Sequence, residues 1–144
     1  MARARLRGAP QFHDRPIFAE IWNTAGSPTR LTAIEEHEPN QCDLRLGPPD
    51  GGSIIRVVEM AAGQRSAMHR TRTMDYGIVL EGEVYLVMED SETRLQPGDI
   101  VVQRGTNHAW DNRSEAPARM AFILLDAEFA PELVASVPHM ALVP

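Results

Sequence analysis

The chain has no lysine, and all fourteen of its basic residues are arginine. This absence excludes Schiff-base chemistry and a lysine general base at any site. A single cysteine, Cys42, excludes an intramolecular disulfide and leads us to expect a reducing, cytoplasmic setting. No apolar run approaches the roughly 20 residues of a membrane span, and no apolar segment follows the basic N-terminus. We therefore expect neither a membrane partner nor a signal peptide.

The balance of charge narrows the expected partners further. The 144 residues carry a formal net charge of −6, and the arginines are scattered, so a nucleic-acid-binding face is not expected. The length suits one domain with a real hydrophobic core. We expect an N-terminal arm and loop region over residues 1–52 that packs on a barrel, a barrel core over 53–126, and a tail with a short helix over 127–144.

Short segments of β-branched and apolar residues recur along the chain, with turn signals between them. We predict strands over residues 17–23, 53–60, 67–69, 74–80, 83–89, 92–95, 99–103, 109–112 and 118–126. Strands this short at such regular spacing are typical of an all-β sandwich or barrel. Residues 96–99, Gln-Pro-Gly-Asp, predict a type II turn with positive φ at Gly98. A short helix is predicted over 131–136, with Pro131 in its first turn.

Two blocks of glycine and histidine carry the most information about function. The first contains Gly63, His69, Asp75 and Gly82, and the second contains Gly98, Gly105, His108 and Asn112. Two imidazoles and a carboxylate on adjacent strands can converge on one interior point. That is how a small β-barrel builds a metal or acid–base site.

These blocks resemble the two motifs of the cupin family, G-x5-H-x-H-x3-E-x6-G and G-x5-P-x-G-x2-H-x3-N, over about residues 53–126. Thr71 stands where the family has a second histidine, and Asp75 stands where it has glutamate. In the second block Gln103-Arg104 replaces Pro-x, and the spacing is one residue short. The resemblance implies an all-β, single-domain cupin, which is a double-stranded β-helix or jelly-roll barrel. Here it would have an N-terminal arm strand and a short C-terminal helix.

The resemblance also implies a small-molecule site inside the barrel, with His69, Asp75 and His108 as metal ligands and catalytic residues. Two histidines and one carboxylate suit a divalent Fe, Mn, Zn or Ni ion. The alternative is a metal-free barrel in which these side chains pair with one another. Asp75 could bind the metal or orient His69 as a proton-sharing partner, because its side chain is shorter than that of glutamate.

Five further residues are expected around this site. Thr71, Gln103 and Asn112 could give the imidazoles their second hydrogen bond. Arg104, at the mouth of the barrel, could clamp a substrate carboxylate. Trp110 would form part of an apolar wall, since alternation places it on the inward face.

Three functions remain open on this reading. The leading one is a metal-dependent enzyme, of decarboxylase, dehydratase, isomerase or dioxygenase type, that acts on a small oxygenated substrate. The second is a non-catalytic ligand-binding or sensing cupin. The third is a metal-free isomerase or epimerase that uses His69 as a base oriented by Asp75. We also expect a homodimer, because the apolar strand over 17–23 needs a sheet to join and would bury Phe18 and Trp22 against a second subunit.

Overall fold

The computed structural model describes residues 16–31 and 47–136 of the chain. The expectations for the arm before Pro16, for Cys42 and for the tail beyond residue 136 fall outside these described residues. In the part of the chain that is described, no helix has the length and apolar character that a bilayer crossing requires.

The described chain is built from short strands, as the sequence predicts. The strands are β1 (Ile17–Thr24), β2 (Ser53–Met60), β3 (Thr73–Glu81), β4 (Val84–Val87), β5 (Glu92–Leu95), β6 (Ile100–Arg104), β7 (Ala109–Asp111) and β8 (Ala118–Asp126). One helix, α1 (Pro131–Ser136), follows and begins at its proline. The predicted strand over residues 67–69 is wrong, because His69 forms only an isolated bridge to His108.

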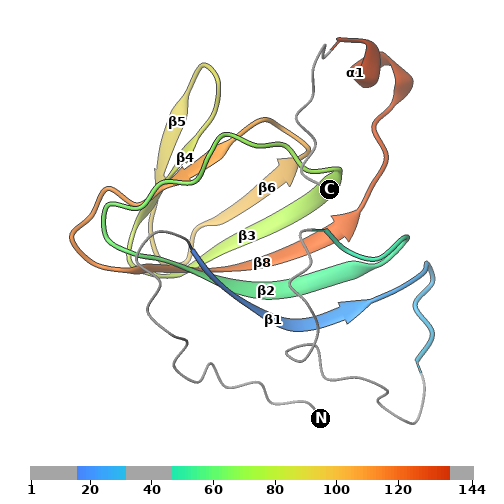
Figure 1. Ribbon diagram of the computed structural model, residues 1–144, viewed down its shortest axis with the longest axis horizontal. Coiled ribbons are helices and arrows are strands. Elements are labelled where there is room, and N and C mark those ends of the chain that lie inside the picture. The colour runs from blue at the N-terminus through green and yellow to red at the C-terminus, as the bar shows by residue number, and fades with distance from the viewer. Residues whose placement is uncertain (1–15, 32–46, 137–144) are drawn as a thin grey trace.

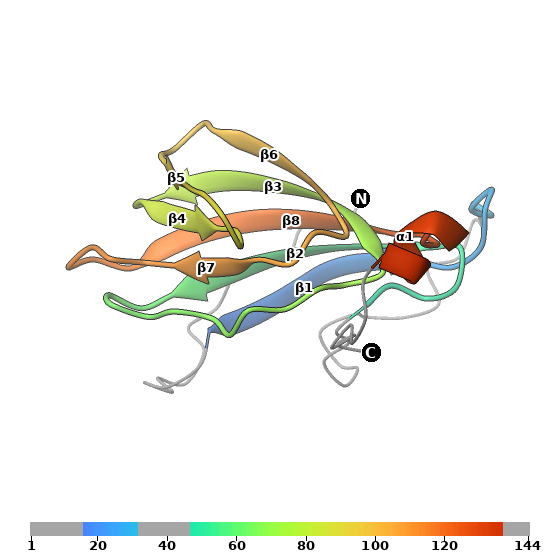
Figure 2. The same ribbon diagram turned by 90° about the horizontal axis from the view of Figure 1, so that it is seen from above.

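The strands form two antiparallel sheets, which confirms the predicted all-β class. The larger sheet has the order β1-β2-β8-β3-β6, and the smaller has the order β5-β4-β7. The smaller sheet lies toward one end of the larger sheet, and α1 lies at the opposite end (Figure 1). Figure 2 shows the strands of the larger sheet following one another from β6 to β1. The core lies between the two sheets and contains inward side chains of both, such as Val79, Met120 and Trp110.

Alternation along the strands decides which side chains face this core. In β3 the residues Thr73, Asp75, Gly77 and Val79 are buried, and the residues between them are not. A Cβ at Gly77 would lie 3.0 Å from the ring of Phe122, so a larger residue there would require that ring to shift. The predicted turn over residues 96–99 is confirmed, since Gly98 has φ 96° and the Asp99 amide donates to the Gln96 carbonyl at 3.0 Å.

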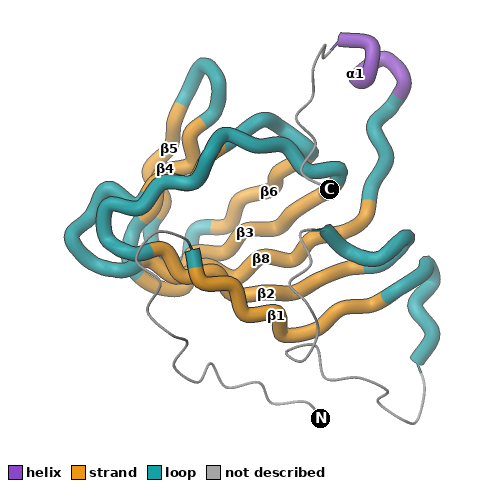
Figure 3. The backbone as a smooth tube through the Cα atoms, in the orientation of Figure 1, coloured by secondary structure: helices purple, strands orange, loops and turns teal. Residues whose placement is uncertain are grey.

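The first strand corrects the expectation that it needs a second subunit. β1 pairs antiparallel with β2 of its own chain, with Phe18 opposite Val58 and Glu20 opposite Arg56. It forms the edge of the larger sheet beside β2 (Figure 3). Phe18 packs against the core of the same chain. The segment of more than twenty residues between β1 and β2 is long enough to bring the two strands together, so the apolar strand satisfies one of its edges without a partner.

Candidate functional site

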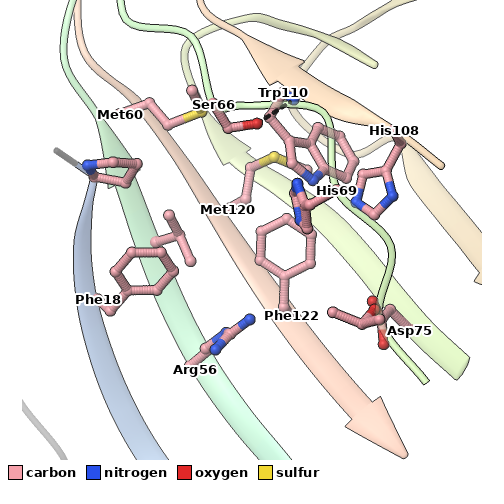
Figure 4. A pocket seen from close by; sticks show the side chains of 13 residues that line it. Phe18, Arg56, Met60, Ser66, His69, Asp75, His108, Trp110, Met120 and Phe122 are labelled. Atoms are coloured by element: carbon pink, nitrogen blue, oxygen red, sulfur yellow. Dashed lines mark hydrogen bonds between the residues drawn. The ribbon is translucent and has the colours of Figure 1, made fainter. Parts of the chain in front are cut away.

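The two histidines of the sequence blocks are joined directly by the backbone. The His69 amide donates to the His108 carbonyl at 2.8 Å, and the His108 amide donates back at 2.9 Å. Residues that exchange both hydrogen bonds have their side chains on the same face of the pair. The two imidazole rings therefore lie together, with centroids 4.4 Å apart, at one wall of a cavity (Figure 4).

Both rings are held in the same tautomer by backbone carbonyls. The Nδ1 of His69 lies 2.9 Å from the Ala67 carbonyl, and the Nδ1 of His108 lies 2.9 Å from the Thr106 carbonyl. A carbonyl oxygen only accepts, so each Nδ1 donates and each neutral ring keeps a lone pair on Nε2. Burial lowers the pKa of His108 to about 4, so this ring is neutral at physiological pH.

A buried carboxylate lies on the neighbouring strand. Asp75 lines the same cavity from β3, and its Oδ1 is buried without a hydrogen-bond partner. Burial raises the pKa of Asp75, while the Thr73 hydroxyl and the charge of Arg56 oppose the rise only in part. Asp75 therefore holds its proton to higher pH than an exposed aspartate does. Figure 4 shows its carboxylate set apart from the two imidazole rings.

Arg56 and Phe18 are site residues that the sequence reasoning missed. Both line the cavity, and the Arg56 guanidinium carbon lies 5.2 Å from the centre of the Phe18 ring. Burial lowers the pKa of Arg56, and the carboxylates of Asp75 and Glu20 act against that lowering. The sequence did contain a signal, because Arg56 lies two residues after Ile54 and two before Val58, which are both inward residues of strand β2. Its parity alone assigns the arginine to the inward face.

The rest of the cavity wall is mainly apolar. The cavity has a volume of about 80 Å³, roughly half that of the ~150 Å³ apolar cavity that binds benzene, so it can enclose one small group of a ligand. Trp110 meets His108 edge-on at 5.8 Å and Phe122 at 5.2 Å between ring centroids. Val58, Met60 and Met120 continue this wall. The cavity thus has one apolar side and one side that carries imidazole, carboxyl and guanidinium groups (Figure 4).

The structure brings together some of the sequence-predicted site residues. His69, Thr71, Asp75, His108 and Trp110 all line the cavity. Thr71 accepts a hydrogen bond of 2.8 Å from the Thr73 hydroxyl, so it does not serve as an outer partner of an imidazole Nδ1.

The other three predicted residues lie elsewhere. Asn112 is fully buried, and its amide donates to the carbonyls of Met60, Ala61 and Ala116 at 2.9–3.2 Å. It therefore ties backbone segments together. Gln103 is buried where it accepts from the Thr106 hydroxyl. Arg104 is exposed and lines a separate hollow near α1, because alternation on β6 turns it away from the inward Gln103.

The geometry bears directly on the expected three-ligand metal site. Within residues 16–31 and 47–136, no group of three or more His, Cys, Asp or Glu side chains could hold a metal ion. His69 and His108 could offer two Nε2 atoms, but Asp75 does not join them. The residues described do not fit the expected ligand set, because the position of the second family histidine is Thr71 and the shorter aspartate stays beside Thr73 and Arg56.

Comparison with known proteins gives clear relatives. The family described as "Cupin domain" matches residues 56–124. The chain is 52% identical over 119 residues to phomopsin biosynthesis cluster protein D from Diaporthe leptostromiformis, a match that covers 79% of this chain and 63% of that protein. It is 44% identical over 111 residues to the cupin-domain-containing oxidoreductase fogC from Aspergillus ruber, covering 74% and 54%. The chain therefore spans only 54–63% of the length of these relatives.

Solved structures resemble the fold at low sequence identity. An uncharacterized conserved protein with a double-stranded β-helix domain from Klebsiella pneumoniae has a TM-score of 0.58 at 18% identity, covering 87% of this chain and 92% of that one. The Cnp3 cupin domain of Schizosaccharomyces pombe has a TM-score of 0.52 at 15% identity, covering 77% and 61%. These likenesses concern the arrangement of strands alone.

Proposed function

The chain is a cupin-domain protein, and from this premise we propose that it catalyses proton transfer on a small, mainly apolar carbonyl compound held in the cavity. The observation that carries this proposal is the placement of two imidazoles, each with its Nδ1 held by a backbone carbonyl, and of a buried carboxyl group around one cavity. The reaction class is an isomerisation or a related lyase step. This proposal develops the hypothesis of a metal-free isomerase. The imidazoles are oriented by backbone carbonyls instead of by Asp75.

The two walls of the cavity support the substrate class. Aromatic and aliphatic side chains such as Trp110, Phe122 and Met120 favour an apolar carbon skeleton. The polar wall would recognise a single oxygenated group, because Asp75 in its protonated form donates to a carbonyl oxygen and Arg56 stabilises negative charge on that oxygen. A cavity of about 80 Å³ limits the part of the molecule that can enter.

The proton transfers balance without another reactant. In this proposal an imidazole Nε2 accepts the proton from the carbon next to the carbonyl group, and Asp75 gives its proton to the carbonyl oxygen to form an enol. In a β,γ-unsaturated carbonyl compound this enol is a dienol. The imidazole returns its proton to the γ carbon and Asp75 takes back the proton of the enol oxygen, which gives the conjugated isomer. In a saturated ketone the proton returns to the same carbon, and the reaction is observed as hydrogen exchange. The backbone carbonyls of Ala67 and Thr106 orient the imidazole rings, so Asp75 is not needed for that role and can donate its proton to the carbonyl oxygen of the substrate.

The names of the relatives support a setting for this chemistry. Two of them are named as biosynthesis cluster proteins of phomopsin and one of oryzines. We propose that the chain likewise acts in the biosynthesis of a secondary metabolite. A second candidate, oxidoreductase activity, is favoured by the printed names of fogC, srdB and virC, which are 40–44% identical to this chain.

Deuterium exchange tests the proposal. Small ketones from butanone to cyclohexanone are incubated with the chain in D₂O, and deuterium next to the carbonyl is measured by mass spectrometry. We expect exchange well above the buffer rate, a loss of at least about 100-fold in the double variant His69→Ala/His108→Ala, and no loss in Arg104→Ala, which changes an exposed residue outside the cavity.

Binding is followed in parallel to separate the outcomes. The chain has two tryptophans, so a Trp22→Phe variant leaves Trp110, in the cavity wall, as the reporter of ligand fluorescence. Binding of the ketones without exchange would overturn the enzymatic proposal and leave a ligand-binding protein. Exchange that persists in the double histidine variant would overturn the assigned residues. A product changed in oxidation state would favour the oxidoreductase candidate.

A further inference from the structure

A second hollow lies at the end of the larger sheet that carries α1. β3 runs antiparallel to both β6 and β8, so the first residues of β3 lie beside the last residues of the other two strands. The chain that leaves β8 passes along these strand ends on its way to α1 (Figure 1). The hollow between them has a volume of about 250 Å³, against about 80 Å³ for the cavity, and the two share no described lining residue.

Two contacts hold the segment after β8 over the strand ends. The Ala127 amide donates to the carbonyl of Arg72, the residue before β3, at 3.2 Å. The Phe129 ring lies against Gly105, which follows the end of β6, and a Cβ at Gly105 would come within 2.6 Å of that ring. Gly105 has φ 62°, so glycine also suits the left-handed backbone there. The hollow is therefore a formed part of the fold, with its wall anchored at two strand ends.

The polar wall of the hollow carries two guanidinium groups. Arg104 is exposed at the end of β6 and forms no ion pair with a described residue. The Arg72 guanidinium lies 3.7 Å from the Asp126 carboxylate, which is longer than a hydrogen bond, and that carboxylate also accepts from the Gly51 amide at 2.7 Å. Glu128 is the one carboxylate among the described lining residues. Even with Arg72 counted in full, the lining has one net positive charge, which matches an anion with a single negative charge.

The remaining wall of the hollow is apolar. Met74 lies opposite Arg104 in the register of β3 and β6, so their side chains share one face of the sheet. Phe129 and Leu133 close the hollow from the segment after β8 and from α1. A ligand seated there would meet guanidinium groups at one end and aromatic and aliphatic side chains at the other. That combination recognises an anion that carries a hydrocarbon body.

We propose that this hollow is a second ligand site, which binds an organic monocarboxylate with an aromatic or aliphatic body. The planar guanidinium of Arg104 matches a carboxylate through two parallel hydrogen bonds, and the charge of the wall suits a carboxylate better than a phosphate dianion. The hydrocarbon body lies against Phe129 and Met74. Arg104 thus serves a site of its own, while the cavity takes an uncharged carbonyl compound. The two proposals rest on different residues, so either can fail without the other.

Amide chemical shifts of the isotope-labelled full chain, measured during titration with phenylacetate, test the proposal. We expect saturable shifts at Gly105, Ala127 and Phe129, because these residues form the wall of the hollow, and no comparable shifts at His69 and His108 in the cavity. Phenylacetamide has the same shape without the charge, so it should bind at least about tenfold more weakly than phenylacetate.

Three variants locate the site and its charge. Arg104→Gln should weaken the binding of phenylacetate about tenfold and leave that of phenylacetamide unchanged. Arg30→Gln changes an exposed arginine outside the hollow and should bind phenylacetate as the parent does. Ala130→Trp places a large ring at an exposed position of the wall and should abolish the saturable shifts by filling the hollow. Shifts confined to the cavity, no saturable shift at millimolar phenylacetate, equal binding of phenylacetamide, or full affinity in Arg104→Gln would each overturn the proposal.

Discussion

The two faces of the larger sheet are made from alternate residues of the same strands, yet each carries residues of a kind that is usual on the other face. The inner face, which covers the core, holds the charged groups Arg56 and Asp75. The outer face, which meets solvent, holds apolar side chains such as Ile55, Ile100 and Val102. Alternation therefore assigns a residue to one face of the sheet, but it does not tell whether that face is buried or exposed to solvent. A charged residue on the inner face is an indication of something that binds there.

The largest expected effect comes from truncating the inner face. Leu124→Ala should lower the free energy of unfolding by about 2–5 kcal/mol, because Leu124 is 1% exposed and its loss leaves a cavity. Ile100→Ala on the outer face should cost less than about 1 kcal/mol. Urea denaturation of both variants, at concentrations where the chain is a monomer, checks this difference. Equal costs would mean that the outer face is packed within the single chain.

Low pH should also lower the stability of the fold through a residue on the inner side, His108. The pKa of His108 is lowered from 6.5 to about 4, so the unfolded chain binds the proton first, and stability falls as pH drops from 6.5 toward 4. The loss should reach about 3 kcal/mol. His108→Gln should remove most of this dependence. Urea midpoints of the parent chain and of His108→Gln are measured across this pH range, and Arg104→Gln is the control on the outer face. An equal loss of stability in all three proteins would contradict the role of His108.

Ligand binding should distinguish the arginine on each face. Arg56→Met keeps an apolar stem but removes the charge from the cavity, and we expect cyclohexanone to bind about tenfold more weakly, a difference of about 1.4 kcal/mol. Arg104→Met should leave binding unchanged, because Arg104 lies in a separate hollow. Trp110 fluorescence gives both dissociation constants. An equal effect of the two changes would remove Arg56 from the proposed site.

The smallest expected effect is a gain of stability at the buried carboxyl group. Burial raises the pKa of Asp75, so its ionised form costs free energy as pH rises through the raised value. Asp75→Asn should therefore stabilise the chain at neutral pH by on the order of 1 kcal/mol while abolishing deuterium exchange. The gain should disappear in acid, where Asp75 is protonated. A loss of stability at neutral pH would mean that the carboxylate is satisfied by Arg56.

Much of the fold could be predicted from the sequence. The β-branched segments predicted all eight strands within a few residues, although the ninth predicted strand, over 67–69, is wrong, and Pro97-Gly98 predicted the turn that the structure contains. Of the candidate site, the two blocks predicted His69, Asp75 and His108, which line the cavity, but not Arg56 or Phe18. Arg104 and Asn112 could not be placed in this way, because family spacing does not say which side of a strand end, or which backbone carbonyls, a long polar side chain reaches.

What the sequence by itself determined is therefore local and periodic: the strand class, the inward parity of Asp75 and Trp110, and the turns that glycine permits. Only the tertiary structure decided which distant segments became neighbours. It paired β1 with β2 and so placed Phe18 on Arg56, and it joined His69 to His108 through their backbones. The physical reason is that period-2 alternation fixes the direction of a side chain relative to its own strand. Contacts across strands depend instead on sheet order and register, which are set by the burial of the whole core.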